Sequence, residues 1–235
     1  MVDLLKKETK NRQALISVKN LTKTYQSAAG EFTALHEVNL EVYQGELLTI
    51  IGKSGAGKTT LINMISGIDH LSSGEIHFDN ELVSEMNEDQ LAAWRGRKLG
   101  MIYQSFYLMP GLNLVNNITL PLDFAGLYQR KDATTRALEL LRMVELEEHA
   151  FKFPSQVSGG QQQRVAIARA LVNDPPVIVA DEPTGRLDSA TAEIIFKIFE
   201  KLVEQGKTIL MVSHDMNFAK RSTRTLEIAD GRILY

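Results

Sequence analysis

Cysteine is absent from this chain of 235 residues, and so are a long apolar run and an excess of positive charge. Without cysteine there can be no disulfide, thiol nucleophile or thiolate metal site, and this composition fits a reducing compartment. No apolar run approaches the roughly 20 residues that a membrane-spanning helix needs, and Met1 to Gln13 lack the apolar core of a signal peptide. We therefore expect a mobile tail over residues 1–14, a protein that is soluble by itself, and a membrane role only through a partner.

The overall composition is that of an ordinary globular protein, with 44% hydrophobic residues, 23% charged residues and a formal net charge of −3. That balance gives no sign of a nucleic-acid-binding surface, so we expect no nucleic-acid partner. The length is enough to bury a substantial core. We expect a single domain over residues 15–235.

The most informative segment present is Gly52–Thr59, which fits the phosphate-binding pattern G-x-x-x-x-G-K-[ST] at every fixed position. Glycines let the backbone wrap closely around an anion, with N–H groups pointing inward. Lys58 would reach the β- and γ-phosphates, and the Thr59 hydroxyl would ligate Mg²⁺. The loop follows an apolar strand-like run, Glu46–Ile51, and precedes a helical pattern formed by Leu61, Ile62, Ile65 and Ile68, with the helix end expected at Gly67. Strand, loop and helix in this order are the context that the motif requires. The sequence predicts nucleotide contacts from Gly52, Lys53, Ser54, Gly55, Ala56, Gly57, Lys58, Thr59 and Thr60.

The rest of the chain reads as an α/β fold with three parts. Residues 16–42 and 74–80 have the patterns of antiparallel strands and turns, whereas residues 105–172 are predicted to form a mostly helical insertion. Buried strands at 177–180 and 208–212 flank a helix at 190–204, which indicates a parallel core. Asp230-Gly231 is typical of a hairpin turn.

Acidic and basic side chains follow these core strands. Asp181 can hold Mg²⁺ opposite Thr59, and Glu182 is a candidate general base for a water that attacks the γ-phosphate. His214, after the next strand, is a candidate donor to the γ-phosphate. Ligands of open α/β sheets collect at the carboxyl ends of strands, where all three motifs fall.

A second loop of the phosphate-binding type opens the segment Val157-Ser158-Gly159-Gly160-Gln161. It combines a serine and two glycines at the predicted start of a helix, whose N-terminus favours anions. Since the first loop already accounts for a triphosphate, this second loop has no evident target in its own subunit.

These motifs together resemble those of the ATP-binding subunit of ABC (ATP-binding cassette) transporters, and the likeness runs from about Leu15 to Leu234. The resemblance implies the ABC ATPase fold, a P-loop core with an antiparallel β subdomain and a helical subdomain at about 105–172. It identifies Walker A at 52–59, Walker B at 177–182, the signature at 157–161 and the D-loop at 185–188. It also assigns roles to three single residues. Gln104 is the Q-loop residue and a magnesium contact, His214 is the switch histidine, and Tyr25 is the aromatic residue that stacks on adenine.

The resemblance also implies how such a chain works. Two copies pair head to tail, and Ser158, Gly159, Gly160 and Gln161 of each contact the ATP held by the other. Integral membrane permease subunits are the expected partners, on the cytoplasmic face of the cell membrane. ATP and Mg²⁺ are the expected cofactors, with Lys58, Gln104, Glu182 and His214 as the catalytic group.

Finer matches point to the macrolide-exporter, lipoprotein-release and cell-division branch of this family. They are Leu108-Met109-Pro110, Leu120-Pro121-Leu122 and Asp181-Glu182-Pro183-Thr184-Gly185. Three positions depart from the usual pattern, with Val157 in place of leucine, Arg186 in place of asparagine and Asn116 in place of glutamate. The last two leave the partner and the coupling open.

Two alternatives compete with a transporter ATPase. A soluble ABC-type ATPase of ribosomes, DNA repair or chromosomes usually has two cassettes, long coiled coils or zinc modules, and none of these is evident here. A P-loop kinase or GTPase would give the second loop and His214 no role. The apolar run Phe106–Met109 is expected either to dock a membrane subunit or to pack under the helical insertion.

Overall fold

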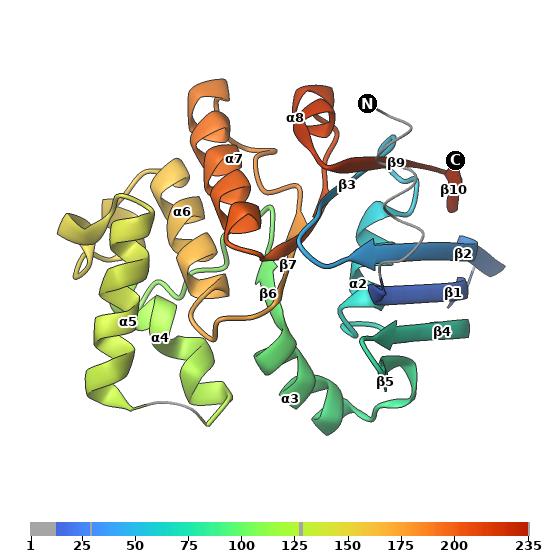
Figure 1. Cartoon of the computed structure of the whole chain (residues 1–235), viewed down its shortest axis with the longest axis horizontal. Coiled ribbons are helices and arrows are strands. Elements are labelled where there is room, and N and C mark those ends of the chain that lie inside the picture. The colour runs from blue at the N-terminus through green and yellow to red at the C-terminus, as the bar shows by residue number, and fades with distance from the viewer. Residues whose placement is uncertain (1–12, 29, 127–128, 235) are drawn as a thin grey trace.

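The computed structural model describes residues 13–28, 30–126 and 129–234, which form two β-sheets surrounded by helices (Figure 1). The strands are β1 (Ala14–Ser27), β2 (Gly30–Tyr43), β3 (Leu47–Ile51), β4 (Ser73–Phe78), β5 (Glu81–Leu82), β6 (Leu99–Ile102), β7 (Val177–Asp181), β8 (Thr208–Val212), β9 (Arg224–Ala229) and β10 (Arg232–Leu234). The helices are α2 (Lys58–Ile65), α3 (Glu88–Lys98), α4 (Leu114–Phe124), α5 (Arg130–Met143), α6 (Gly159–Ala170), α7 (Ser189–Glu204) and α8 (Met216–Arg221), with 3-10 turns at Val83–Glu85, Glu147–His149 and Pro154–Gln156.

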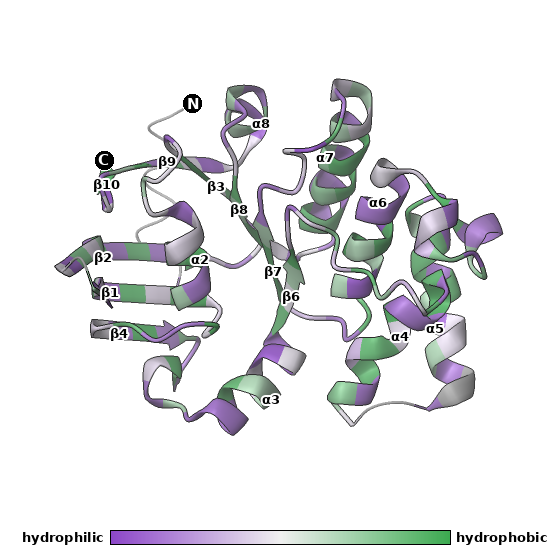
Figure 2. Cartoon of the chain, turned by 180° about the vertical axis from the view of Figure 1, so that it is seen from behind, coloured by the Kyte–Doolittle hydropathy of each residue, from purple (hydrophilic) through white to green (hydrophobic). Residues whose placement is uncertain are grey.

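The larger sheet has the strand order β10-β9-β3-β8-β7-β6, and all its neighbouring pairs are parallel except β9 with β10. Its central strands are short apolar runs because both faces are covered, and every residue of β8 is buried. Successive residues of β7 face opposite ways. Ile178 and Ala180 pack with the helical side, and Val177 and Val179 pack with the side of the antiparallel sheet. The sheet therefore divides the molecule into two cores, and its central strands β7 and β8 stand out as hydrophobic in Figure 2.

The smaller sheet is antiparallel, with the order β2-β1-β4-β5. Helix α2 lies between it and the larger sheet (Figure 1). Leu61, Ile62 and Ile65 of α2 are buried as predicted, but Ile68 is 44% exposed. The helix ends at Ile65, and Gly67 turns the chain away from it with φ of 63°, which confirms the end expected at this glycine and leaves Ile68 outside the helix.

Helices α4, α5 and α6 make up the predicted helical segment, and no strand occurs among the described residues of 105–172. Helix α6 also packs against β6 and α7, so it joins this segment to the larger sheet. Most helices begin at a side chain that accepts a backbone N–H, as Asn113, Ser158 and Asp188 do for α4, α6 and α7.

The expected tail 1–14 falls mostly on residues that lie outside the described part of the chain, whereas Ala14 already belongs to β1. In the described residues, none of the helices has the length and hydropathy needed to cross a bilayer.

Candidate nucleotide-binding site

The loop Gly52–Thr59 joins β3 to α2 at the carboxyl edge of the larger sheet. Its glycines are required by geometry, because Gly55 and Gly57 have φ of 79° and 105°, values that side chains strongly disfavour. A Cβ at Gly57 would also lie 2.8 Å from the carbonyl oxygen of Ala34. The backbone therefore takes its curved path only with glycine at this point, and α2 starts with Lys58 directly after it.

The Lys58 side chain is buried at the centre of the loop. Its Nζ donates to the carbonyl oxygens of Gly52 at 2.9 Å and Lys53 at 3.0 Å, so these two hydrogen bonds link the end of the loop to its beginning. The same Nζ lies 4.0 Å from a carboxylate oxygen of Glu182. The first loop thus concentrates N–H groups and one buried cation at a helix N-terminus, which is an arrangement suited to phosphate.

Asp181 ends β7 beside the loop, and its Oδ1 accepts a hydrogen bond from the Thr59 hydroxyl at 3.3 Å. Burial raises the pKa of the Asp181 carboxyl above its ordinary value, while the bond from Thr59 opposes that shift. A partly desolvated carboxylate next to a hydroxyl is a donor set that a hard divalent cation would favour.

Glu182 follows with a left-handed backbone, φ 45°, which is uncommon for a residue other than glycine. Its N–H donates to the Val212 carbonyl oxygen at 3.0 Å, and one carboxylate oxygen lies 3.4 Å from Nδ1 of the exposed His214. A Cβ on Gly185 would lie 2.9 Å from Nε2 of Gln104 and 3.2 Å from an oxygen of Glu182. The structure thus brings Lys58, Gln104, Glu182 and His214 together at one edge.

Tyr25, on β1, lies at the side of this edge. Its hydroxyl donates to Asp69 at 3.0 Å, and the Nζ of Lys23 lies 4.7 Å from its ring centroid. Partial burial and the Asp69 carboxylate raise the pKa of Tyr25, whereas a hydrogen bond with the Thr60 side chain lowers it. Tyr25 therefore lies next to Thr60, the residue that directly follows the first loop.

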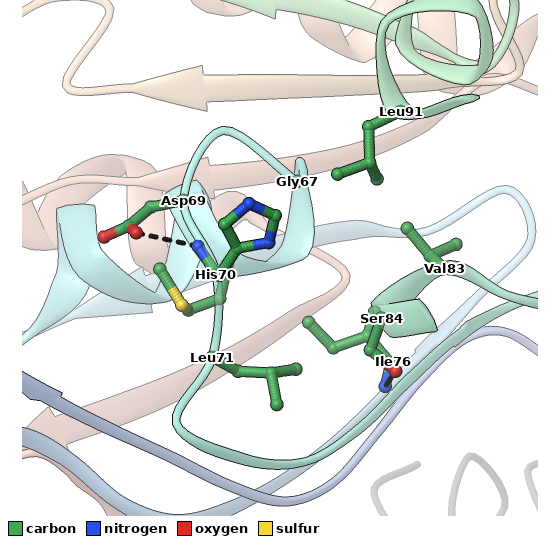
Figure 3. A pocket seen from close by; sticks show the side chains of 9 residues that line it. Gly67, Asp69, His70, Leu71, Ile76, Val83, Ser84 and Leu91 are labelled. Carbon is green, nitrogen blue, oxygen red and sulfur yellow. Dashed lines mark hydrogen bonds between the residues drawn. The ribbon is translucent and has the colours of Figure 1, made fainter. Parts of the chain in front are cut away.

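Asp69 also borders a small cavity of about 170 Å³ between the end of α2 and η2 (Val83–Glu85), which Figure 3 shows. Apolar side chains such as Leu71, Ile76 and Leu91 line it together with the polar residues Asp69, His70 and Ser84. The Asp69 carboxylate accepts a hydrogen bond from Nζ of Lys23 at 2.8 Å, and Nε2 of His70 lies 2.6 Å from a carboxylate oxygen of Glu88. The polar groups at this cavity are thus paired within the chain.

Ser158 caps α6, and the second loop differs from the first. The Ser158 hydroxyl accepts from the Gln161 N–H at 3.2 Å, and the Ser158 N–H donates to the Gln161 side chain at 2.8 Å. A Cβ on Gly160 would lie 2.4 Å from the Thr191 methyl group, whereas one on Gly159 would meet only Phe106, at 3.7 Å. No hydrogen bond or ion pair within the described residues joins this loop to residues 52–60.

The three departures from the family pattern lie at different depths. Val157 is partly buried and packs against the helical core, which suits an exchange of one apolar residue for another. Asn116 and Arg186 are exposed.

Two positions of interest carried little signal in the sequence. Gln163 is fully buried and donates to backbone carbonyls beside the site, and its only trace was a polar residue on the inward face of an otherwise apolar helix pattern. Asp69, the partner of Tyr25, lies 44 residues away from it in a loop.

Comparison with known proteins adds independent information. A family model described as ABC transporter matches residues 35–185. An uncharacterised ABC transporter ATP-binding protein, MJ0796 of Methanocaldococcus jannaschii, is 45% identical over 223 residues, which cover 93% of this chain and 95% of that protein. The macrolide export ATP-binding/permease protein MacB of Syntrophobacter fumaroxidans is 43% identical over 221 residues, which cover 93% of this chain but 31% of that longer protein.

Solved structures agree with this likeness. The dimeric structure of MJ0796, described as a bacterial ABC transporter cassette, matches with a TM-score of 0.87 and 44% identity, over 94% of this chain and 97% of that one. A dimeric post-hydrolysis state of the same cassette, bound to ADP and Pi, also has a TM-score of 0.87, at 43% identity and the same coverage.

Proposed function

Because this chain belongs to the family of ABC transporter ATP-binding proteins, we propose that it is the subunit that powers a membrane transporter or mechanotransmission complex through ATP-driven closure of a dimer. As a member of this family it binds ATP and is an ATPase. The identity with MacB supports a place in the macrolide-exporter, lipoprotein-release and cell-division branch. The subunit would lie on the cytoplasmic face of the cell membrane, held there by its permease partner.

One observation carries the paired model. The chain has two loops suited to phosphate, but among the described residues only Gly52–Thr59 combines a buried cation with carboxylates beside it. The loop at Ser158 has hydroxyls, its own and that of Thr191, but no ion pair in the described part of the chain, and it opens a helix at exposed positions. Two copies paired head to tail would give each Ser158 loop the γ-phosphate held by the other copy, and relatives of this chain are dimeric.

Each residue of the first loop and its surroundings then has a role. Lys58 would exchange its two carbonyl acceptors for β- and γ-phosphate oxygens. Glu182, oriented by His214 and Lys58, would accept the proton of the attacking water as the bond between the β- and γ-phosphates breaks and ADP leaves. His214 would donate to the γ-phosphate, and Tyr25 would stack on adenine.

The donor set also fits Mg²⁺. Thr59 and Asp181 already present oxygens to each other, and Gln104 lies beside Glu182 across Gly185. When bound, the ion would neutralise charge on the β- and γ-phosphates. Thr59, Gln104 and Asp181 would hold it, and the raised pKa of Asp181 is consistent with a carboxylate that gains from a nearby positive charge.

The segment after Gln104 is the proposed docking surface for the membrane subunit. Leu108 packs against the helical core, whereas Tyr107 and Met109 are 64% and 48% exposed. One part of the apolar run therefore packs under the helical segment, and the other part is free to dock a membrane subunit. These two side chains line a groove of about 420 Å³ together with Arg95, Arg169 and several apolar residues. Both arginines bond only backbone carbonyls among the described residues. A partner segment that combines apolar side chains with a carboxylate would complement this groove.

The test of the paired model uses two inactive variants. Lys58→Ala removes the cation of the first loop, and Ser158→Arg blocks the second. If the loops act across a dimer, a mixture of the two variants forms one intact composite site per mixed dimer, so part of the ATPase activity returns. Specific activity should also rise with protein concentration. A mixture that stays inactive, together with wild-type activity that does not depend on concentration, would refute the paired model.

The docking surface is tested separately. Tyr107→Asp and Met109→Asp are expected to leave basal ATPase within a few-fold and to abolish co-purification with the permease subunit. Phe151→Asp, at another exposed aromatic residue outside the groove, is the matched control. Full co-purification of both groove variants would place the docking surface elsewhere.

A further inference from the structure

The side chain of Gln163, one turn into α6, is completely buried. Its Nε2 donates to the carbonyl oxygen of Pro183 at 2.8 Å and reaches that of Tyr103 at 3.5 Å. Since both neighbours are acceptors, the amide nitrogen must face them. The other amide atom, Oε1, accepts no hydrogen bond from the described residues. A buried acceptor that is left unpaired is destabilising, so packing alone does not favour glutamine here.

The two carbonyls that Gln163 contacts have a common property. Pro183 directly follows Glu182, and Tyr103 directly precedes Gln104. A single side chain of α6 therefore contacts the backbone next to both of the residues proposed to act on the γ-phosphate.

The backbone at Glu182 needs such support. Glu182 has a left-handed backbone, which is unfavourable for a residue other than glycine and persists only where its surroundings enforce it. The N–H of Glu182 is held by Val212, and its carbonyl oxygen accepts from Gly185 at 3.0 Å. Gln163 holds the next carbonyl along the chain. These three bonds together aim the carboxylate toward His214 and Lys58.

We propose that Gln163 is a positioning residue that links the signature helix to the backbone carrying Glu182 and Gln104 of its own chain. The proposal rests on the function of Glu182 given above. Ser158 and Gln163 belong to one short, rigid helix, so a displacement of the Ser158 loop when it meets the partner's nucleotide is passed to Pro183 and Tyr103. Formation of one composite site would thereby align the general base of the other.

The experiment replaces Gln163 by methionine, which has a similar length but no N–H group. Turnover at saturating ATP is expected to fall by about 10- to 100-fold, the scale of a misplaced catalytic group. The KM for ATP should stay within about threefold, because the first loop is unchanged. In the Glu182→Gln background, Gln163→Met should cause no further fall, since two residues that act through one step are not additive.

Asn173→Leu is the matched control. Asn173 also donates from its amide to two backbone carbonyls, of Gly96 and Pro121, and its Oδ1 is buried without a partner. Both variants should lower the unfolding temperature, but only Gln163→Met should lower basal turnover. Gln163→His, which restores one N–H donor, should recover part of the turnover and replaces the methionine variant in the cycle if that variant does not fold.

The outcomes separate this proposal from the one it rests on. Normal turnover by Gln163→Met, or effects of Gln163→Met and Glu182→Gln that multiply, would overturn the positioning role while Glu182 remained the base. Normal turnover by Glu182→Gln itself would overturn the base and the positioning role together.

Discussion

The loops Gly52–Thr59 and Ser158–Gln161 both combine glycines with a hydroxyl residue at a helix N-terminus, yet glycine serves a different purpose in each. In the first loop, Gly55 and Gly57 are needed for their left-handed backbone. In the second, Gly159 and Gly160 begin a regular helix, and what matters is the missing side chain. A loop that must curve around its ligand thus differs from one that must let another surface approach, although the residue types are similar.

The largest expected effects separate the loops by chemistry. Lys58→Ala should abolish measurable ATP binding to the single chain, because it removes the buried cation at the centre of the first loop. Ser158→Ala should leave that binding unchanged, since the hydrogen bonds of Ser158 within the described part of the chain all join it to its own helix. Glu182→Gln should bind ATP but turn it over about 10²–10⁴ times more slowly. Titration with a fluorescent ATP analogue and a phosphate-release assay measure both quantities. Equal loss of ATP binding in Lys58→Ala and Ser158→Ala would remove the distinction between the loops.

The next effect tests the two uses of glycine. Gly57→Ala should destabilise the fold by about 1–3 kcal/mol, because its φ of 105° and the Ala34 carbonyl both oppose a Cβ. Gly159→Ala should change stability by less than about 0.5 kcal/mol, since its nearest neighbour is in ordinary contact. It should nevertheless weaken ATP-driven dimer formation. Thermal unfolding and size-exclusion chromatography with ATP, both in the Glu182→Gln background, check this. An unchanged dimer in Gly159→Ala would mean that no surface approaches there.

The smallest effect concerns pH. Burial raises the pKa of Asp181 beside the first loop, so its ionised form is penalised in the folded chain. That penalty is absent below the ordinary pKa, grows as pH rises through the raised pKa and remains at neutral pH. Without nucleotide or divalent cation, Asp181→Asn should therefore raise the unfolding temperature at pH 7, by a small amount because solvent screens this partly exposed group. The gain should vanish in acid.

Asp188, near the second loop, provides the opposite sign. Its bond from the Thr191 side chain holds its pKa below the ordinary value. It therefore contributes stability above its ordinary pKa, and this is lost as pH falls through the lowered value. Asp188→Ala should lower the unfolding temperature at pH 7, and the difference should shrink in acid. Parallel pH profiles for the two variants would contradict the assigned shifts.

Local patterns in the sequence predicted most of the fold. Apolar runs located the core strands β3, β7 and β8, because strands covered on both faces need no polar residues. The end of α2 was predicted at Gly67, and this is confirmed, because the helix stops at Ile65 and Gly67 takes the left-handed turn that follows it. Ile68 keeps the helical spacing but lies beyond that turn and is exposed, so periodicity alone does not set where a helix stops.

The parts that could not be predicted depend on contacts between distant segments. The division of Phe106–Met109 into inward and outward side chains follows from how α6 packs on this segment, including the two bonds from Arg169 to the Phe106 and Tyr107 carbonyls. Gln163 acquires its importance only when residues 103 and 183 meet across 80 positions of sequence. Neither feature has a local pattern.

The hydrogen bonds that cap the start of α6 can be exchanged for hydrogen bonds to a ligand. In the single chain, Ser158 and Gln161 satisfy each other's N–H groups. In the paired arrangement proposed above, a phosphate oxygen from the other copy would substitute for one of these internal acceptors, so one cap would replace another with little change in the number of bonds. The contribution of this loop to the affinity between subunits would then be the small difference in free energy between the internal cap and the phosphate cap. Once the γ-phosphate is released, the internal hydrogen bonds between Ser158 and Gln161 would form again, so the two subunits would separate easily.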